Sequence, residues 1–95
     1  MKIDFSKLPC WSDIRKQGKV NINVKYDLSN AMYMQGGGVE IGSLAMKIYN
    51  SEGEVEYSKE ECNIILNFVS KVNVMLADSL EDLIKQGESN EVLND

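Results

Sequence analysis

The sequence contains no histidine among its 95 residues. Histidine is the usual general base near neutral pH, the common partner of a serine or cysteine nucleophile, and the most frequent zinc ligand. Its absence removes the mechanisms of most hydrolases. The composition therefore predicts a protein that is not an enzyme.

Cysteine is nearly as scarce, because Cys10 and Cys62 are the only two. Two distant cysteines supply neither a disulfide framework nor paired zinc ligands, so we expect free thiols. Neighbouring carboxylates such as Glu60 and Glu61 lack the alternating oxygen ligands of a calcium loop, and we expect them to cap and solvate helices. The sequence predicts no metal and no cofactor.

Long apolar runs are also missing. No stretch of about 18 apolar residues could cross a bilayer, and the opening MKIDFSKLP carries Asp4 and Lys7 where a signal peptide needs apolar residues. We therefore expect no membrane contact and a soluble protein in the cytoplasm.

The composition that is present is globular, with 43% apolar and 26% charged residues and a single proline. A chain of this length supports one hydrophobic core. We expect one compact domain over residues 1–87. The last eight residues, ESNEVLND, have no periodicity and predict a flexible acidic tail over residues 88–95.

Alternation of apolar and polar residues predicts a strand over Val20–Tyr26, with Val20 on its buried side. Gly18 indicates a turn before it, so Asp13–Lys16 is expected to run back along this strand as the other arm of an N-terminal β-hairpin. Short extended pieces are also expected over Ile3–Phe5 and Val55–Tyr57.

Two short helices are expected next, separated by three glycines. The first is capped by Asp27 and the second covers Val39–Asn50. Gly36 is expected to end the first helix in the left-handed conformation, and the two glycines after it to reverse the chain. Replacing Gly37 by a β-branched residue is therefore expected to damage folding.

The last expected element is a long C-terminal helix. Ser58 and Glu61 form the S-x-x-E capping box, so the helix should begin at Lys59. An apolar stripe continues to Gly87, with a kink expected near Val72 and Asn73, where β-branched residues cluster. Together these elements predict an α+β fold.

The stretch MQGGGVEIGS invites a test for a phosphate-binding loop. A P-loop needs a lysine before its hydroxyl residue, and Gly42 precedes Ser43 directly. A dinucleotide fingerprint starting at Gly36 would need glycine where Ile41 stands. Both motifs fail, and a turn between helices is the preferred interpretation. A candidate anion site remains at Gly38, Val39 and Glu40, where the second helix begins.

Charge is divided unevenly between the two halves of the chain. Residues 1–50 hold seven basic and four acidic residues, whereas residues 51–95 hold three basic and eleven acidic ones. The acidic pI of 4.7 disfavours nucleic-acid binding. The charges either keep the protein soluble or contact a protein partner. The candidate contacts are Arg15, Lys16, Lys19 and Lys25 on the hairpin and Glu52, Glu54 and Glu56 in the acidic half.

Trp11 and the methionines each allow two interpretations. Trp11 follows a proline turn and is expected to lock that loop onto the core, although such a residue can also anchor a partner. Flexible thioether side chains fill irregular cores and also suit adaptable binding surfaces. We expect core filling by Met32, Met34, Met46 and Met75.

The run AMYMQGGGVEIGSLAMKIYNSEGEVEYSKEE, after the start KIDFSK and a charged hairpin, resembles small uncharacterised proteins encoded by bacteriophages and prophages. The resemblance covers residues 2–61 and contains no catalytic motif. It implies an accessory protein in the host cytoplasm that acts by occupying the surface of a host protein.

Three hypotheses follow. The first is a non-enzymatic protein-binding module. The second is a virion structural or assembly protein that forms a homo-oligomer, with a homodimer through the helix over Lys59–Gln86. The third is a binder of a small anion or nucleotide at the glycine-rich turn.

Overall fold

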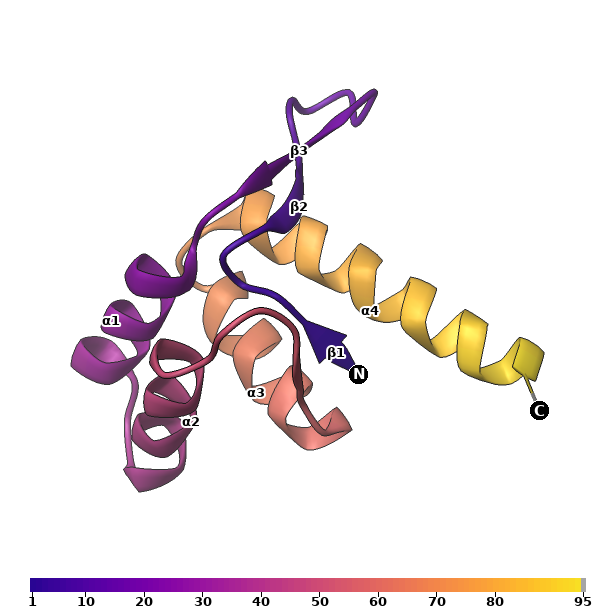
Figure 1. Cartoon of the computed structure of the whole chain (residues 1–95). Helices are drawn as coiled ribbons and strands as arrows, with labels where there is room; N and C mark the ends of the chain where they lie inside the picture. The colour runs from indigo at the N-terminus through magenta and orange to yellow at the C-terminus, as the bar shows by residue number, and fades with distance from the viewer. Residues whose placement is uncertain (95) are drawn as a thin grey trace.

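Eight elements make up the computed structural model, which describes residues 1–94, with side chains described up to residue 87 (Figure 1). In chain order they are β1 (Lys2–Ile3), β2 (Leu8–Trp11), β3 (Lys19–Ile22), α1 (Lys25–Gln35), α2 (Val39–Tyr49), β4 (Val55–Glu56), α3 (Lys59–Ser70) and α4 (Val74–Asn94). The α+β class is confirmed. The tail expected over residues 88–95 lies outside the residues whose side chains are described.

The N-terminal hairpin pairs β2 with β3 in antiparallel register, with Trp11 opposite Lys19. The expectation that Asp13–Lys16 forms one arm is wrong, because these residues lie in the loop that joins the strands (Figure 1). Proline is tolerated at a sheet edge, and Pro9 lies in β2, whose one partner strand is β3. A proline turn in the sequence is thus an edge strand in the fold.

The strand expected over Val20–Tyr26 is shorter and less buried than its alternation suggested. It ends at Ile22, and Val20 is 51% exposed. The reason is that α4 packs against β2 and leaves β3 on the outside. Cys10, which pairs with Val20 across the hairpin, is fully buried instead.

A second, smaller sheet joins the start of the chain to its middle. Ile3 in β1 pairs with Val55 in β4, so the short extended pieces expected in both regions meet each other. The N-terminal ammonium donates to the carbonyl of Tyr57 at 2.9 Å and to the Glu56 carboxylate at 3.1 Å. Phe5 lies edge-on to the ring of Tyr57, at 5.4 Å between centroids, within the core.

The glycine-rich turn between α1 and α2 differs in detail from the expected one. Gly36 ends α1 in an extended conformation, with φ −73° and ψ 142°, so the left-handed assignment is wrong. The positive φ belongs to Gly38, at 93°. The cap expected at Asp27 is also wrong, because α1 begins at Lys25 and places Asp27 in its first turn.

The C-terminal apolar stripe forms two helices, α3 and α4, rather than one long helix. The capping box is confirmed: the N–H of Glu61 donates to the Ser58 hydroxyl at 3.1 Å and the N–H of Ser58 donates to the Glu61 carboxylate at 2.8 Å. The chain breaks after Ser70, and the N–H of Leu76 donates to the Asn73 side chain at 3.0 Å. Asn73 thereby caps α4 and fixes the break where a kink was expected.

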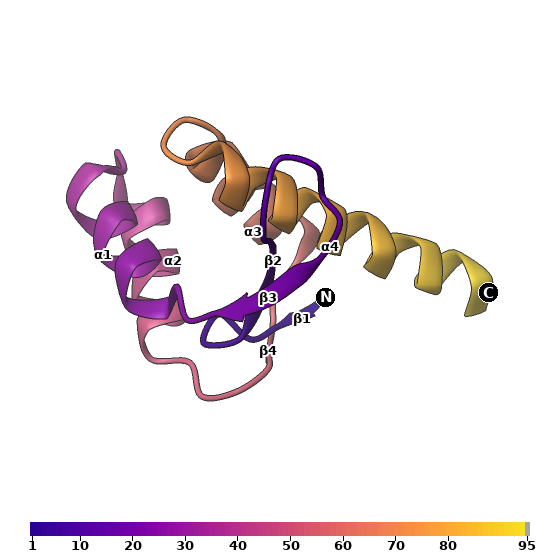
Figure 2. The same ribbon diagram turned by 90° about the horizontal axis from the view of Figure 1, so that it is seen from above.

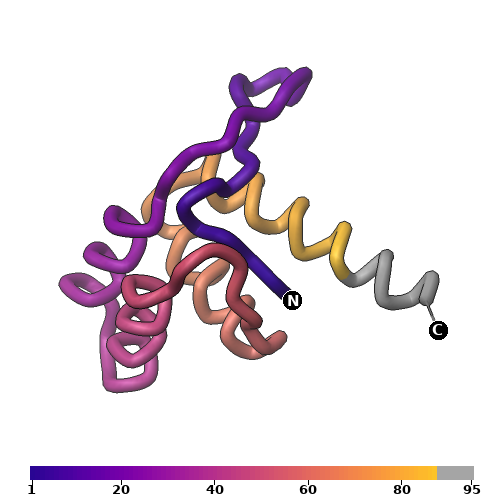
Figure 3. The backbone as a smooth tube through the Cα atoms, in the orientation of Figure 1, coloured from indigo at the N-terminus to yellow at the C-terminus, as the bar shows by residue number. Residues whose placement is uncertain are grey.

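The core is shared by all these elements. Seen from above, α3 and α4 lie on one side of the strands, while α1 and α2 form a helical pair at one end of the molecule (Figure 2). The tube in Figure 3 shows the start of the chain running between the α2–β4 connection and α4. The largest fully buried side chains come from both halves of the chain: Tyr57, Phe5, Ile3, Leu8, Met32, Ile48, Ile65 and Leu80.

Candidate functional site

The basic residues of the hairpin face the acidic helix of the same chain. Lys19 contacts the Asp82 carboxylate at 2.6 Å, and its ammonium lies 4.4 Å from the centre of the Trp11 ring. Lys16 lies 3.6 Å from Asp78. Two of the four cations expected to meet a partner therefore meet α4 instead.

The other two cations that were expected on the hairpin lie free of these pairs. Within residues 1–87, neither Arg15 nor Lys25 has a carboxylate within 4 Å. Arg15 lies in the loop beside Ile14, which is 97% exposed. Lys25 begins α1, well away from that loop in the chain, so the four residues do not form one basic surface.

The acidic residues singled out from the sequence surround the turn at Gly53. All three, Glu52, Glu54 and Glu56, are exposed, and Glu56 contacts the N-terminal ammonium. The structure does not bring them together with the hairpin cations. Among the residues with described side chains, no three histidine, cysteine, aspartate or glutamate side chains are grouped to hold a metal ion.

The two cysteines are buried free thiols. Burial raises the pKa of Cys10 and that of Cys62 above the ordinary value of 9.0. Burial likewise raises the pKa of Tyr57, whose hydroxyl has no hydrogen-bond partner within the described side chains. All three groups are protonated near neutral pH, so the thiols are poor nucleophiles there.

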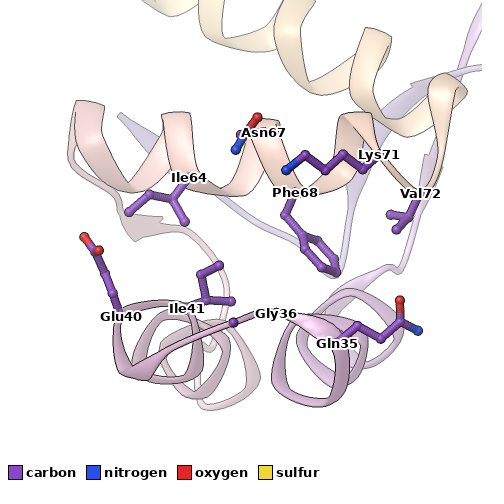
Figure 4. A pocket seen from close by; sticks show the side chains of 10 residues that line it. Gln35, Gly36, Glu40, Ile41, Ile64, Asn67, Phe68, Lys71 and Val72 are labelled. Carbon is purple, nitrogen blue, oxygen red and sulfur yellow. The ribbon is translucent and has the colours of Figure 1, made fainter.

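An open groove lies between the glycine-rich turn and α3 (Figure 4). Its volume is about 430 Å³, within the range of sites that hold small ligands or anchor side chains. Phe68 from α3 and Ile41 from α2 point into it from opposite sides. Ile64 on α3 and Val72 just after that helix extend the apolar surface. We call this site the hinge groove.

Polar groups stand on the rim of the hinge groove. Lys71 and Asn67 lie on the α3 side and Glu40 on the α2 side, while Gln35 ends α1 (Figure 4). Neither Lys71 nor Glu40 has an oppositely charged partner within 4 Å among residues 1–87. An apolar floor with one free charge of each sign suits an amphipathic ligand.

The candidate anion site at Gly38, Val39 and Glu40 borders this groove. Gly38 precedes the first turn of α2, whose free N–H groups favour an anion. Glu40 already places a carboxylate in that turn and opposes one. Val39 is 87% exposed and contributes no polar side chain, so the three residues alone do not build an anion site.

A second notable surface lies on the outer side of α1 and α2. The side chains of Tyr26 and Tyr49 meet there edge-on, with ring centroids 6.5 Å apart. Tyr33 and Met46 are exposed on the same two helices. Core filling is wrong for Met34, Met46 and Met75, which are exposed, and right for Met32. Trp11 is half-buried, packed against Lys19 rather than inside the core.

Sequence reasoning missed the hinge groove because its residues come from separate elements. Phe68 belongs to α3 and Lys71 directly follows that helix, and no spacing in the sequence relates them to Gln35 or Glu40. The outer surface of α1 and α2 did leave a signal. Tyr26 and Tyr33 are seven residues apart, as are Val39 and Met46, and this spacing places each pair on one side of its helix.

Comparison of the chain with models of protein families, with curated proteins and with solved structures finds no match. Within the described part of the chain, none of the helices combines the length and apolar character needed to cross a membrane.

Proposed function

We propose that this protein is a protein-binding module whose hinge groove holds a short amphipathic segment of a partner. The observation that carries the proposal is the open groove of about 430 Å³, with Phe68 and Ile41 pointing into it from opposite sides and charges without an oppositely charged partner among residues 1–87 on its rim. The resemblance to small phage-encoded proteins implies a host protein as that partner.

The rim charges define the segment that fits. An apolar side chain resting on Phe68 and Ile41 gains free energy from the area it buries. A carboxylate on one side of it would contact Lys71, and a basic group on the other side would contact Glu40. The groove therefore favours a segment whose apolar residues are flanked by an acidic residue on one side and a basic residue on the other. The positions of Lys71 and Glu40 fix the direction in which that segment binds.

The test is a titration with short peptides, followed by amide chemical shifts. The probe is a capped peptide with two leucines flanked by aspartate on one side and lysine on the other. Two peptides serve for comparison: one with the flanking residues exchanged and one with asparagine and glutamine as flanking residues. We expect saturable shifts at Ile64, Phe68 and Lys71, with the weak affinity of a short ligand, a Kd of about 1 mM or below.

One variant and one control separate specific binding from a general charge effect. Lys71→Glu should weaken binding of the charged probe about three- to fivefold, as expected for an exposed ion pair, and leave the neutral peptide little changed. Lys59→Glu makes the same charge change at an exposed site outside the groove and should have no effect. Absence of saturable shifts with all three peptides would overturn the proposal.

The alternative of an anion or nucleotide at the glycine-rich turn is tested in the same experiment. Inorganic phosphate and ATP are added in place of the peptides, and the amides from Gly37 to Gly42 are followed. Free N–H groups at the start of α2 and the nearby Lys71 favour such a ligand, whereas Glu40 opposes it. Saturable shifts with phosphate but not with the peptides would show that the protein binds an anion at the glycine-rich turn and not a peptide in the hinge groove.

A further inference from the structure

Among the elements that the structure describes, none covers the outer surface of the pair formed by α1 and α2. Figures 1 and 2 both show the pair at one end of the molecule, away from α4. This surface carries five exposed apolar or aromatic side chains and one glycine: Tyr26, Tyr33, Val39, Met46, Tyr49 and Gly42. We call it the tyrosine face.

The two helices run in opposite directions (Figure 1), and the contact of Tyr26 with Tyr49 sets their register. Tyr33 lies two turns along α1 from Tyr26, and Gly42 lies two turns back along α2 from Tyr49. Tyr33 and Gly42 are therefore opposite one another. The face has a pair of rings in edge-on contact at one end, and at the other a ring beside a position without a side chain.

The chain's own packing does not explain Gly42. A glycine inside a helix costs about 1 kcal/mol relative to alanine. A Cβ at Gly42 would meet nothing within 4 Å among the described atoms outside its own helix backbone, and its φ lies outside the left-handed region. A bare backbone at this position does, however, allow another polypeptide to approach α2 closely.

We propose that a second copy of this chain covers the tyrosine face. Residues 25–50 contain two basic residues, Lys25 and Lys47, and two acidic ones, Asp27 and Glu40, so this segment has no net charge, while the chain carries −5. Two copies that meet through their neutral segments keep their acidic helices apart. Contact through the tyrosine face minimises the repulsion between like-charged molecules.

The symmetry of such a dimer follows from the shape of the face. In a two-fold contact each α1–α2 pair packs on the other, which gives two layers of two helices, as in a four-helix bundle. The edge-on rings of Tyr26 and Tyr49 in one copy can then approach the bare backbone at Gly42 in the other. Eleven-residue helices are about 16 Å long, so the contact is small and the dimer weak.

This interface replaces the one expected through Lys59–Gln86. Most of the apolar stripe of that segment, such as Ile65, Val69 and Leu80, is buried within its own chain. Its exposed large apolar residues, Val72, Val74 and Met75, are confined to the break between α3 and α4 and the start of α4.

Sedimentation equilibrium of the full chain tests the proposal, from about 10 µM to about 1 mM, the range for a weak dimer. We expect a monomer–dimer equilibrium that tightens as salt rises from about 20 to about 300 mM, because salt screens the repulsion between acidic copies. Tyr33→Glu should weaken the dimer about tenfold or more. Gly42→Leu should weaken it too, because the added side chain occupies the place of the other copy.

Ile14→Glu is the matched control, since it adds the same charge at an exposed apolar residue far from the face. It should leave the association constant within about twofold, which is less than 0.5 kcal/mol. A strict monomer at the highest concentration would overturn the proposal. Dissociation by Ile14→Glu as strongly as by Tyr33→Glu would also overturn it, because the face would then have no special role.

The outcome is independent of the peptide experiment. Tyr33 does not line the hinge groove, so Tyr33→Glu should bind the peptide probe as the natural chain does. Loss of the dimer with intact peptide binding rejects neither proposal. A dimer without any peptide binding rejects the proposed function alone.

Discussion

At the scale of single residues, Gly36 and Gly37 differ in a way that their shared sequence context hides. Gly36 has an ordinary φ of −73°, so its backbone does not require glycine. A Cβ there would lie 2.5 Å from the carbonyl oxygen of Met32 and closer still to Cγ2 of Ile41. Glycine is needed at position 36 because α2 returns so close to α1.

Gly36→Ala should therefore destabilise the fold by about 1–3 kcal/mol, the usual cost of forcing an extra group into a packed site. The free energy of unfolding in urea measures this, and the slope of the transition should not change. Because Met32 contributes a backbone atom to the clash, a simple side-chain rotation cannot relieve it.

Gly37→Ala is the matched control one residue away. A Cβ at Gly37 meets nothing within 4 Å, and its φ lies outside the left-handed region. The alanine variant should be neutral or up to about 1 kcal/mol more stable, because alanine restricts the unfolded chain. We therefore expect a substitution at Gly36, and not one at Gly37, to damage folding. Equal losses at both positions would contradict this assignment.

At the scale of elements, the start of α3 is held by one carboxylate that serves two neighbours. Glu61 accepts from the N–H of Ser58 at 2.8 Å, and the Lys47 ammonium from α2 contacts both of its oxygens, at 2.9 and 3.0 Å. The bond from Ser58 first, and then the charge of Lys47, hold the pKa of Glu61 below its ordinary value of 4.5.

Glu61→Gln removes the charge and keeps the shape of the capping box. Because the folded-state pKa is lowered, the ionised carboxylate stabilises the fold above pH 4.5, and this contribution disappears as the pH falls through the lower, folded value. We expect the variant to be about 0.5–1 kcal/mol less stable at pH 7, with a difference that shrinks towards zero below pH 4.

Urea unfolding at several pH values measures this difference. Glu60→Gln is the control, since Glu60 lies in the same first turn but accepts no hydrogen bond from the described groups. A difference for Glu61→Gln that persists unchanged at low pH would show that the carboxylate charge has no role.

The same elements show how far sequence reasoning reaches. The capping box at Ser58 is local, so its residues alone predict where α3 begins. The partner of β3 is harder to predict, because Leu8–Trp11 contains a proline. A strand tolerates proline at the edge of a sheet, and among the described residues β2 is such an edge, since it pairs with β3 alone. For α2, apolar residues on most sides concealed which of them, such as Val39 and Tyr49, face outward. The hinge groove depends on the packing of α3 against the α1–α2 turn, which no spacing encodes.

At the scale of the whole molecule, the two oppositely charged halves of the sequence fold against each other. The hairpin comes from the basic half and α4 from the acidic half, and Lys19 with Asp82 joins them at 2.6 Å. Lys16 with Asp78 spans the same interface at 3.6 Å, with both side chains more exposed. Basic residues of the first half therefore pair with acidic residues of the second half within the same molecule.

A double-mutant cycle measures what this arrangement contributes. Lys19→Met keeps an apolar chain against Trp11, and Asp82→Asn keeps the shape of the acceptor. We expect a coupling free energy of about 0.5–1 kcal/mol between them at low salt, because the pair is close and partly buried. The coupling should fall at about 0.5 M salt, where exposed charges are screened.

The cycle on Lys16 and Asp78 is its internal control and should give a coupling near zero, since the distance is longer and the groups are about half exposed. If both cycles give the same coupling, the attraction is a property of the net charge of the two halves and not of one contact. If only the Lys19 cycle is coupled, then the hairpin is fixed on α4 by a specific pair. Arg15, which has no such pair among residues 1–87, is then the hairpin cation left free for contact outside the chain.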